Sequence, residues 1–150
     1  MKANEMKVKD FMTADVHCVT LDMTVKQAIS VLTTNKISGA PVVDNSQKVI
    51  SVISEGSLLK LAAAKFLDKS VASCLGQLPK TESIVSLPSS STFIEVYRLF
   101  LSSPVHRIII TDSNGRLQGI VSRSNVLRIL VSTSVPNEKA DGTPEEAEEN

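Results

Sequence analysis

The feature that most constrains this chain is an internal repeat. Residues 24–62 align without a gap with residues 92–130, at a constant offset of 68. Each copy opens on a capping-box pattern, Thr-x-x-Gln at 24–27 and Thr-x-x-Glu at 92–95. Apolar residues then recur at the i, i+3, i+4, i+7 spacing of an amphipathic helix, at Val25, Ala28, Ile29 and Leu32 and at Phe93, Val96, Tyr97 and Phe100. The chain is therefore expected to build one small unit twice.

The rest of each copy follows one order of elements. Two apolar runs flank a turn-like tetrad, as APVVD-NSQK-VISVIS over residues 40–54 and IIITD-SNGR-LQGIVS over residues 108–122, which predicts a β-hairpin. A further apolar helix closes each copy, predicted over 57–63 and 125–131. Upstream, residues 7–12 resemble 70–75 and residues 18–21 resemble 84–87, which predicts a leading helix and a short strand. The predicted class is α/β of the α+β kind, with helices packed on a small sheet in each repeat.

One copy of about 60 residues buries little surface, so we expect the two copies to pack sheet to sheet, share one core and form a cleft between them. The expected organisation is a lead-in and helix (1–11), a first domain (12–68), a linker helix (69–78), a second domain (79–134) and a disordered acidic tail (135–150).

The net charge of zero hides an asymmetry. Residues 136–150 carry six acidic residues and one lysine, which leaves 15 basic and 10 acidic residues in residues 1–135. A mildly basic body suits a small anionic ligand, whereas the scattered charge and 3% aromatic content make a nucleic-acid partner a poor fit. No apolar run approaches the roughly 20 residues of a membrane span. With no secretory pattern and no C-x-x-C pair at Cys18 or Cys74, we expect a cytoplasmic protein.

Nothing in the sequence predicts an enzyme or a metal site. Gly-rich nucleotide loops of the Rossmann and Walker types are absent. His17 and Cys18 are adjacent, so on a strand their side chains point to opposite faces and cannot act as a pair. No further ligand lies at metal-binding spacing from them, and His106 has no nucleophile or carboxylate placed to form a catalytic set.

The ordered set of patterns resembles a tandem pair of cystathionine β-synthase (CBS) domains, also called a Bateman module. The likeness is carried by FMTADVHCVTLDMTVKQAISVLTTNKISGAPVVDNSQKVISVISEGSLL and by PKTESIVSLPSSSTFIEVYRLFLSSPVHRIIITDSNGRLQGIVSRSNVLRIL, and it covers roughly residues 7–132. The resemblance implies a stand-alone, non-catalytic regulatory protein that forms a homodimer, head to head or head to tail. It also implies a cleft for AMP, ADP, ATP or S-adenosylmethionine, a protein partner regulated in trans, and no catalytic cofactor.

The resemblance also implies site residues. In the family, a Ser or Thr followed three residues later by Asp holds the ribose where the last strand meets the last helix. The second copy offers Ser122 and Asn125 there, His106 and Arg107 near the phosphate, and Ile108, Ile109 and Arg123 beside them. The first copy offers Ser54 and Ser57 at the ribose position, with Gly39, Ala40 and Pro41 and the opening stretch from Thr13 to Val16 around it.

Both ribose positions depart from the family's acid. Replacing Asp by Asn keeps one acceptor oxygen but removes the charge, a deficit of about 1–2 kcal/mol, or roughly 5- to 30-fold in affinity. Ser57 is shorter and cannot accept from two hydroxyls at once. We therefore rank the second-copy site above the first, which we expect to be degenerate.

Two interpretations remain open at this point. Ser54 and Ser122 sit where helix N-caps are needed, and serine is a preferred cap. The cations Arg107, Arg123 and Arg128 are expected either on solvated faces or near one helix N-terminus, which attracts anions. The leading hypothesis is a sensor of an adenosyl ligand. The alternative is a structural, protein-interaction or dimerisation module whose ligand sites have degenerated, and nucleic-acid binding and catalysis rank below both.

Overall fold

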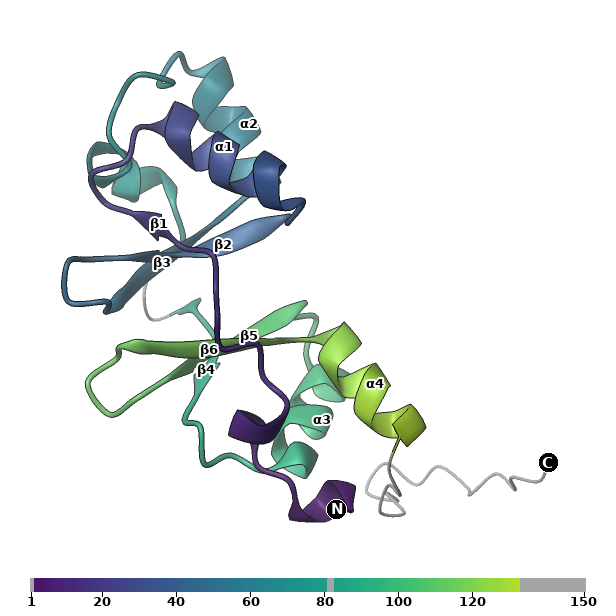
Figure 1. The fold of residues 1–150 in the computed structure, drawn as a ribbon. Coiled ribbons are helices and arrows are strands. Elements are labelled where there is room, and N and C mark those ends of the chain that lie inside the picture. Colours follow the sequence, from purple (N-terminus) through teal and green to yellow (C-terminus); the bar gives the residue numbers. More distant parts are fainter. Residues whose placement is uncertain (1, 81–82, 133–150) are drawn as a thin grey trace.

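The computed structural model describes residues 2–80 and 83–132, so the predicted tail (135–150) lies outside the described residues. Each repeat builds a three-stranded sheet, in the orders β1-β2-β3 and β4-β5-β6 (Figure 1). The strands are β1 (Val19–Thr20), β2 (Gly39–Val43), β3 (Val49–Ser54), β4 (Ser86–Leu87), β5 (Arg107–Thr111) and β6 (Leu117–Ser122). The α-helices are α1 (Val25–Asn35), α2 (Glu55–Ala63), α3 (Phe93–Ser102) and α4 (Arg123–Ser132). Across the described ranges, no helix is long and apolar enough to cross a membrane.

The two sheets have the same register. In the first, β2 and β3 pair antiparallel with Gly39 opposite Ser54, and β1 runs parallel to β2. In the second, β5 and β6 pair antiparallel with Arg107 opposite Ser122, and β4 runs parallel to β5. The predicted hairpins and short leading strands are confirmed, and with them the predicted fold class.

Side-chain caps set where the helices begin. Thr24 Oγ1 accepts from the Gln27 amide at 3.1 Å while Gln27 returns the bond to the Thr24 amide at 2.9 Å, and Thr92 does the same with Glu95. Helices α2 and α4 begin two residues earlier than predicted, at Glu55 and Arg123. The reason is that the serine ending each hairpin is itself the cap, so the helix follows the strand with no loop.

Aspartate closes the turn of each hairpin. Asp112 Oδ1 accepts from the Asn114 amide at 2.8 Å and from the Arg116 amide at 2.9 Å, and the Arg116 bond is the main reason that the pKa of Asp112 is lowered. The two turns also bond to each other, because the Val49 amide donates to the Gly115 carbonyl at 3.0 Å. The hairpin tips therefore hold the repeats together far from the helices.

The repeats exchange their leading segments. The 3₁₀ helices η1 (Ala3–Glu5) and η2 (Val8–Asp10) pack on the second repeat, where the Val8 amide donates to the Ser91 carbonyl at 2.7 Å. In return η3 (Ala72–Gln77), within the segment predicted as a linker helix, packs on the first repeat, where the Val71 amide donates to the Met23 carbonyl at 2.8 Å. Figure 1 shows the purple N-terminal segment beside α3, from which the chain crosses to β1.

The expectation of one shared core is wrong. Each repeat has its own core, built on Val25, Leu32 and Ile53 in the first and on Phe93, Ile108 and Ile110 in the second. A smaller third cluster around Val43, Val49 and Ile109 lies between the two sheets. Because the exchanged segments already complete each core, the sheets need only a limited contact, and space remains beside it for cavities.

Candidate ligand site between the repeats

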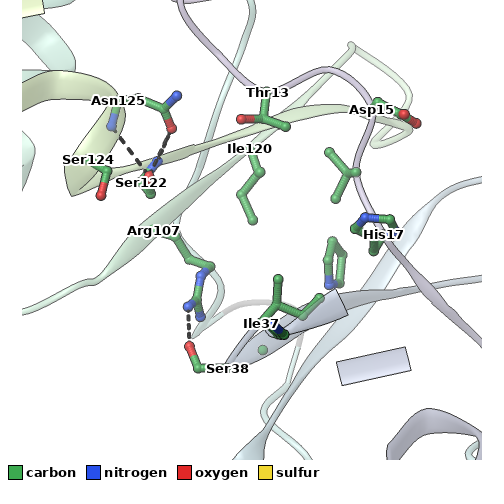
Figure 2. Close-up of a pocket in the computed structure, with 14 residues that line it drawn as sticks. Thr13, Asp15, His17, Ile37, Ser38, Arg107, Ile120, Ser122, Ser124 and Asn125 are labelled. Carbon is green, nitrogen blue, oxygen red and sulfur yellow. Dashed lines mark hydrogen bonds between the residues drawn. The ribbon is translucent and has the colours of Figure 1, made fainter. Parts of the chain in front are cut away.

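The first cavity lies between the repeats and has a volume of about 440 Å³. One wall is the N-terminal arm, defined here as residues 11–17, which passes from the second repeat to the first. Figure 2 shows the arm, the turn after α1 and the β6–α4 junction surrounding one space. Its lining residues are Thr13, Asp15, Val16, His17, Lys36, Ile37, Ser38, Gly39, Pro41, Arg107, Ile120, Ser122, Ser124 and Asn125.

Ser122 and Asn125 bond chiefly to each other. The Oδ1 atom of Asn125 accepts from the Ser122 amide at 2.8 Å and from the Ser122 hydroxyl at 2.9 Å. Ser122 Oγ in turn accepts from the Asn125 amide at 3.4 Å. This is a reciprocal cap at the N-terminus of α4, so the acceptor oxygen that the sequence assigns to a ribose is already occupied twice.

Asn125 also fastens the N-terminal arm. Its Nδ2 donates to the carbonyl of Phe11 at 3.1 Å, and its side chain is only 8% exposed. Beside it, Thr13 and Ile120 exchange two backbone hydrogen bonds of 2.9 Å. Gly119 permits the crossing, because a Cβ there would lie 2.5 Å from Met12 Sδ and 2.9 Å from the Thr13 carbonyl. The amide of Asn125 is therefore a positioning group for the cavity wall, a role that Asp could not fill because it has no donor.

Arg107 lines the space between the two repeats. Its guanidinium donates to Ser38 Oγ at 2.7 Å, and within residues 2–80 and 83–132 it pairs with no carboxylate. Gly39, the repeat counterpart of Arg107, leaves room for it, since a Cβ at Gly39 would lie 2.9 Å from an Arg107 guanidinium nitrogen. Glycine in the first copy thus makes room for arginine in the second copy. The single guanidinium of Arg107 lies against residues of both repeats.

A second cavity of about 340 Å³ lies on the other side of Arg107. Its lining residues are Ala40, Pro41, Val52, Ile53, Ser54, Pro79, Ser83, Ile84, Val85, Val105, His106, Arg107 and Ile109. Ser54 caps α2 by accepting from the Ser57 amide at 3.2 Å, and the two hydroxyls lie 3.1 Å apart. This cavity has a largely apolar wall and no carboxylate among the described residues that line it.

The structure regroups the predicted site residues. The first cavity combines Ser122 and Asn125 of the second copy with four predicted first-copy residues, Thr13, Val16, Gly39 and Pro41. The second cavity combines Ser54, Ala40 and Pro41 of the first copy with His106, Arg107 and Ile109 of the second. The cavities group these residues differently from the prediction by copy, because the exchanged arm and the opposed sheets make each cavity from both repeats.

Three predicted residues lie outside both cavities. Ile108 is fully buried in the core of the second repeat, and Arg123 lies at a separate groove between α3 and α4. Among the described residues, the side chain of Ser57 hydrogen-bonds with Ser54, the cap of α2. Sequence reasoning missed several wall residues of the first cavity, chiefly His17, Lys36, Ile37, Ser38, Ile120 and Ser124. The sequence could have indicated them only by their position, since most lie within two residues of a predicted site residue.

His17 and Cys18 face different surroundings. His17 lines the first cavity, whereas Cys18 packs against the cluster between the sheets, where burial raises the pKa of its thiol. This agrees with the alternation expected of an extended segment. In the described part of the chain, no three His, Cys, Asp or Glu side chains gather as a metal site requires.

Comparison with known proteins identifies the two repeats. The family model for the CBS domain matches residues 8–64 and 75–132. The Arabidopsis thaliana protein CBSX1, described as a chloroplastic CBS domain-containing protein, is 28% identical over 148 residues, which cover 81% of this chain and 62% of CBSX1. This chain thus spans less than two thirds of that relative.

Solved structures show the same fold. The structure of CBSX2 in complex with AMP has a TM-score of 0.70 and 27% identity, covering 84% of this chain and 96% of that one. Protein MJ1004 from Methanocaldococcus jannaschii has a TM-score of 0.76 at 24% identity, covering 85% of this chain and 60% of that one. From its two matched repeats and their fold, this chain belongs to the CBS domain family and carries two CBS domains in tandem.

Proposed function

We propose that this chain is a non-catalytic regulatory module that binds an adenine nucleotide in the first cavity and signals to a protein partner. The observation that carries the proposal is Arg107, whose guanidinium faces the space between the repeats and pairs with no carboxylate of the described chain. The likeness to CBSX2, which was solved with AMP, supports the ligand class. We further propose that the module works as a homodimer in the cytoplasm, where Cys18 and Cys74, both free in the structure, stay reduced.

Charge favours a nucleotide over the other adenosyl ligand of the family. Lys36 and Arg107 give the first cavity two cations, against one carboxylate from Asp15. A phosphate gains charge-assisted hydrogen bonds from such groups, whereas S-adenosylmethionine carries a sulfonium cation instead. A volume of about 440 Å³ is in the range of small-molecule sites.

The ribose diol is expected to contribute little to affinity. Both protein atoms at the predicted ribose position, Ser122 Oγ and Asn125 Oδ1, are engaged with each other, and the Asn125 amide nitrogen holds the arm. A neutral hydrogen bond that displaces an existing one gains little net free energy. The nucleotide would then be held mainly by its phosphate and by the apolar wall near Ile120.

Calorimetric titration tests this function. We expect AMP to release or absorb measurable heat, and 2′-deoxy-AMP to bind within about threefold of AMP, because a threefold change is under 1 kcal/mol. S-adenosylmethionine is the comparison without phosphate and is expected to bind more weakly than AMP. Neither heat nor a thermal shift with any ligand at millimolar concentration would refute the sensor and favour the alternative, a structural module with degenerate sites.

The variant Asn125→Asp distinguishes the role of this residue in ribose binding from its role in holding the arm. The acid loses the donor to the Phe11 carbonyl and sets two oxygens against each other, so we expect the free energy of unfolding to fall by about 1–3 kcal/mol. The carboxylate oxygen that replaces Nδ2 no longer bonds to the arm and can accept from a ribose, so the preference for AMP over 2′-deoxy-AMP should rise by about fivefold or more. Urea unfolding and paired titrations measure the two effects.

Ser57→Asp is the matched control for stability. Ser57 is the repeat counterpart of Asn125, but it holds no arm, and an acid in the first turn of α2 is favoured by the helix dipole. This variant should keep or gain stability. An equal loss of stability in both variants would contradict the role given to the Asn125 amide.

A further inference from the structure

Lys36 ends helix α1 in a backbone conformation that is unusual for lysine. Its φ of 54° and ψ of 46° lie in the left-handed region, which glycine usually occupies after a helix. The Ile37 amide donates to the Leu32 carbonyl at 3.0 Å and the Lys36 amide to the Thr33 carbonyl at 3.4 Å, which together form a Schellman motif. This motif fixes the backbone at Lys36, and glycine would adopt the same conformation without steric cost.

Lys65 ends helix α2 in the same way, but away from the ligand site. Its φ is 68°, the Phe66 amide donates to the Leu61 carbonyl at 3.0 Å, and the Lys65 amide donates to the Ala62 carbonyl at 3.0 Å. Lys65 lines neither the first nor the second cavity, whereas Lys36 lines the first. The two lysines therefore share a conformation and a place at a helix C-terminus, where the dipole favours a cation, and they differ in what surrounds them.

The turn after α1 brings Lys36 close to Arg107. From Lys36 the chain runs through Ile37 to Ser38, whose hydroxyl accepts from the Arg107 guanidinium at 2.7 Å. Two residues of chain span at most about 7 Å, so both cations line the same part of the cavity wall. Figure 2 shows Arg107, Ser38 and Ile37 together on one side of the cavity and Asp15 on another. The carboxylate therefore lies apart from the place where the two cations meet.

The charge of Lys36 distinguishes the first cavity from the second. Lys36 is exposed and forms no ion pair with any residue that the structure describes. Its counterpart 68 positions later is Pro104, which carries no charge. Among the described lining residues, and leaving the histidines aside, the first cavity has the two cations Lys36 and Arg107 and the second has Arg107 alone. A pair of neighbouring cations is therefore a property of the first cavity.

We propose that Lys36 determines how many phosphates the first cavity prefers, by binding a second phosphate group next to the one held by Arg107, so that a nucleoside diphosphate binds more tightly than a monophosphate. This rests on the nucleotide site named under the proposed function, and it adds a specificity-determining residue. The two phosphates of a diphosphate share a bridging oxygen, so two neighbouring cations can hold both. A guanidinium holds one phosphate by paired hydrogen bonds, and a lysine ammonium holds the next as a point charge.

Calorimetric titration with AMP and ADP, in buffer without divalent cations, tests this role. Wild type should bind ADP about three- to tenfold more tightly than AMP, because an exposed ion pair gains modest free energy. Lys36→Gly should bind the two nucleotides within about twofold of each other, with its AMP affinity within about threefold of wild type. Lys36→Arg keeps a cation and should keep the preference for ADP.

Lys65→Gly is the matched control, since it removes the same charge from the same helix-end motif outside the cavity. It should keep the full preference for ADP. Both glycine variants should melt at a temperature no lower than that of wild type, because glycine is the residue that this conformation favours. Inorganic pyrophosphate should compete with AMP more strongly than orthophosphate does, and Lys36→Gly should remove that difference.

Three results would overturn the role of Lys36. Wild type that binds AMP without preferring ADP would do so and would leave the proposed nucleotide site standing. An equal loss of AMP and ADP affinity in Lys36→Gly, with a lower melting temperature, would assign the lysine to the fold instead. Loss of the ADP preference in Lys65→Gly as well would show that net charge acts at long range. Binding of neither nucleotide to wild type would refute the proposed function itself, and this inference with it.

Discussion

Phe93→Ala is expected to lower the free energy of unfolding by about 3–5 kcal/mol, the largest loss of stability that we expect from one substitution in this chain. Phe93 is fully buried in the core of the second repeat. Its ring packs edge-on against Phe11 and beside Tyr97, with both ring centroids at 5.6 Å, and its amide donates to the Met6 carbonyl at 3.1 Å. Truncation to alanine leaves a cavity in the core. It also removes the ring contact with Phe11, which holds the exchanged N-terminal segment on the second repeat. Urea unfolding followed by circular dichroism measures the loss.

Val25 provides the internal control, because it is the counterpart of Phe93 in the first repeat and is also fully buried. Val25→Ala removes two methyl groups, which should cost about 2 kcal/mol. It should also leave the N-terminal arm in place, since that arm packs on the other repeat. Limited proteolysis near Thr13 should therefore accelerate in the Phe93 variant alone. If both variants lost the same stability and the arm were equally protected, the structural role given to Phe93 would be wrong.

The elements of each repeat could be predicted from the sequence because their causes are local. The capping box at Thr24 and the apolar spacing after it act within one or two turns of helix, and the hairpin signals act within five residues. The same local signals recur at Thr92, so each repeat supported the prediction for the other. The starts of α2 and α4 were predicted two residues late, because a serine that both ends a strand and caps a helix leaves no loop to mark the boundary.

The cavities could not be grouped correctly from the sequence because they depend on contacts between distant segments. The hydrogen bond from Val8 to Ser91 fixes the exchange of leading segments, and no spacing in the sequence shows that the lead-in packs on the far repeat. The same limit applies to Asn125. A sequence shows that the Asn125 side chain has an acceptor oxygen, but only the fold shows that Ser122 already donates to this oxygen twice. Only the fold shows, too, that Asn125 Nδ2 donates a hydrogen bond to the Phe11 carbonyl.

What the sequence could supply was the list of positions where a ligand site can form. Eleven of the fourteen residues predicted from the family resemblance line one cavity or the other, and Pro41 and Arg107 line both. Those positions lie on elements that the repeat pattern fixes, such as the start of β2 and the end of β6. The contacts at those positions depend on neighbours, which is why the sequence does not show that Asn125, predicted at the ribose position, holds the arm.

Arg107→Ala is expected to weaken AMP by about 10- to 100-fold and to leave adenosine affinity unchanged. The guanidinium is the charged donor shared by both cavities, and a hydrogen bond to a charged group is worth about 1.5–3 kcal/mol, with 1.4 kcal/mol per tenfold change. Adenosine has no phosphate to bind the guanidinium, so its affinity should be the same for the variant and the wild type. Calorimetric titration with AMP and adenosine in parallel measures the difference.

Two further variants show whether the expected loss of AMP affinity is specific to Arg107. Arg128→Ala removes a guanidinium from the exposed face of α4 and should leave both affinities unchanged. Ser38→Ala removes the hydroxyl that Arg107 now contacts at 2.7 Å, so the guanidinium is freed for phosphate and AMP should bind as tightly as before or more tightly. The ligand's charged end would have to lie elsewhere if Arg107→Ala weakened adenosine as much as AMP, or if Arg128→Ala matched its effect on AMP. In that case the role of the Arg107 guanidinium would be only to link the two repeats through its hydrogen bond to Ser38.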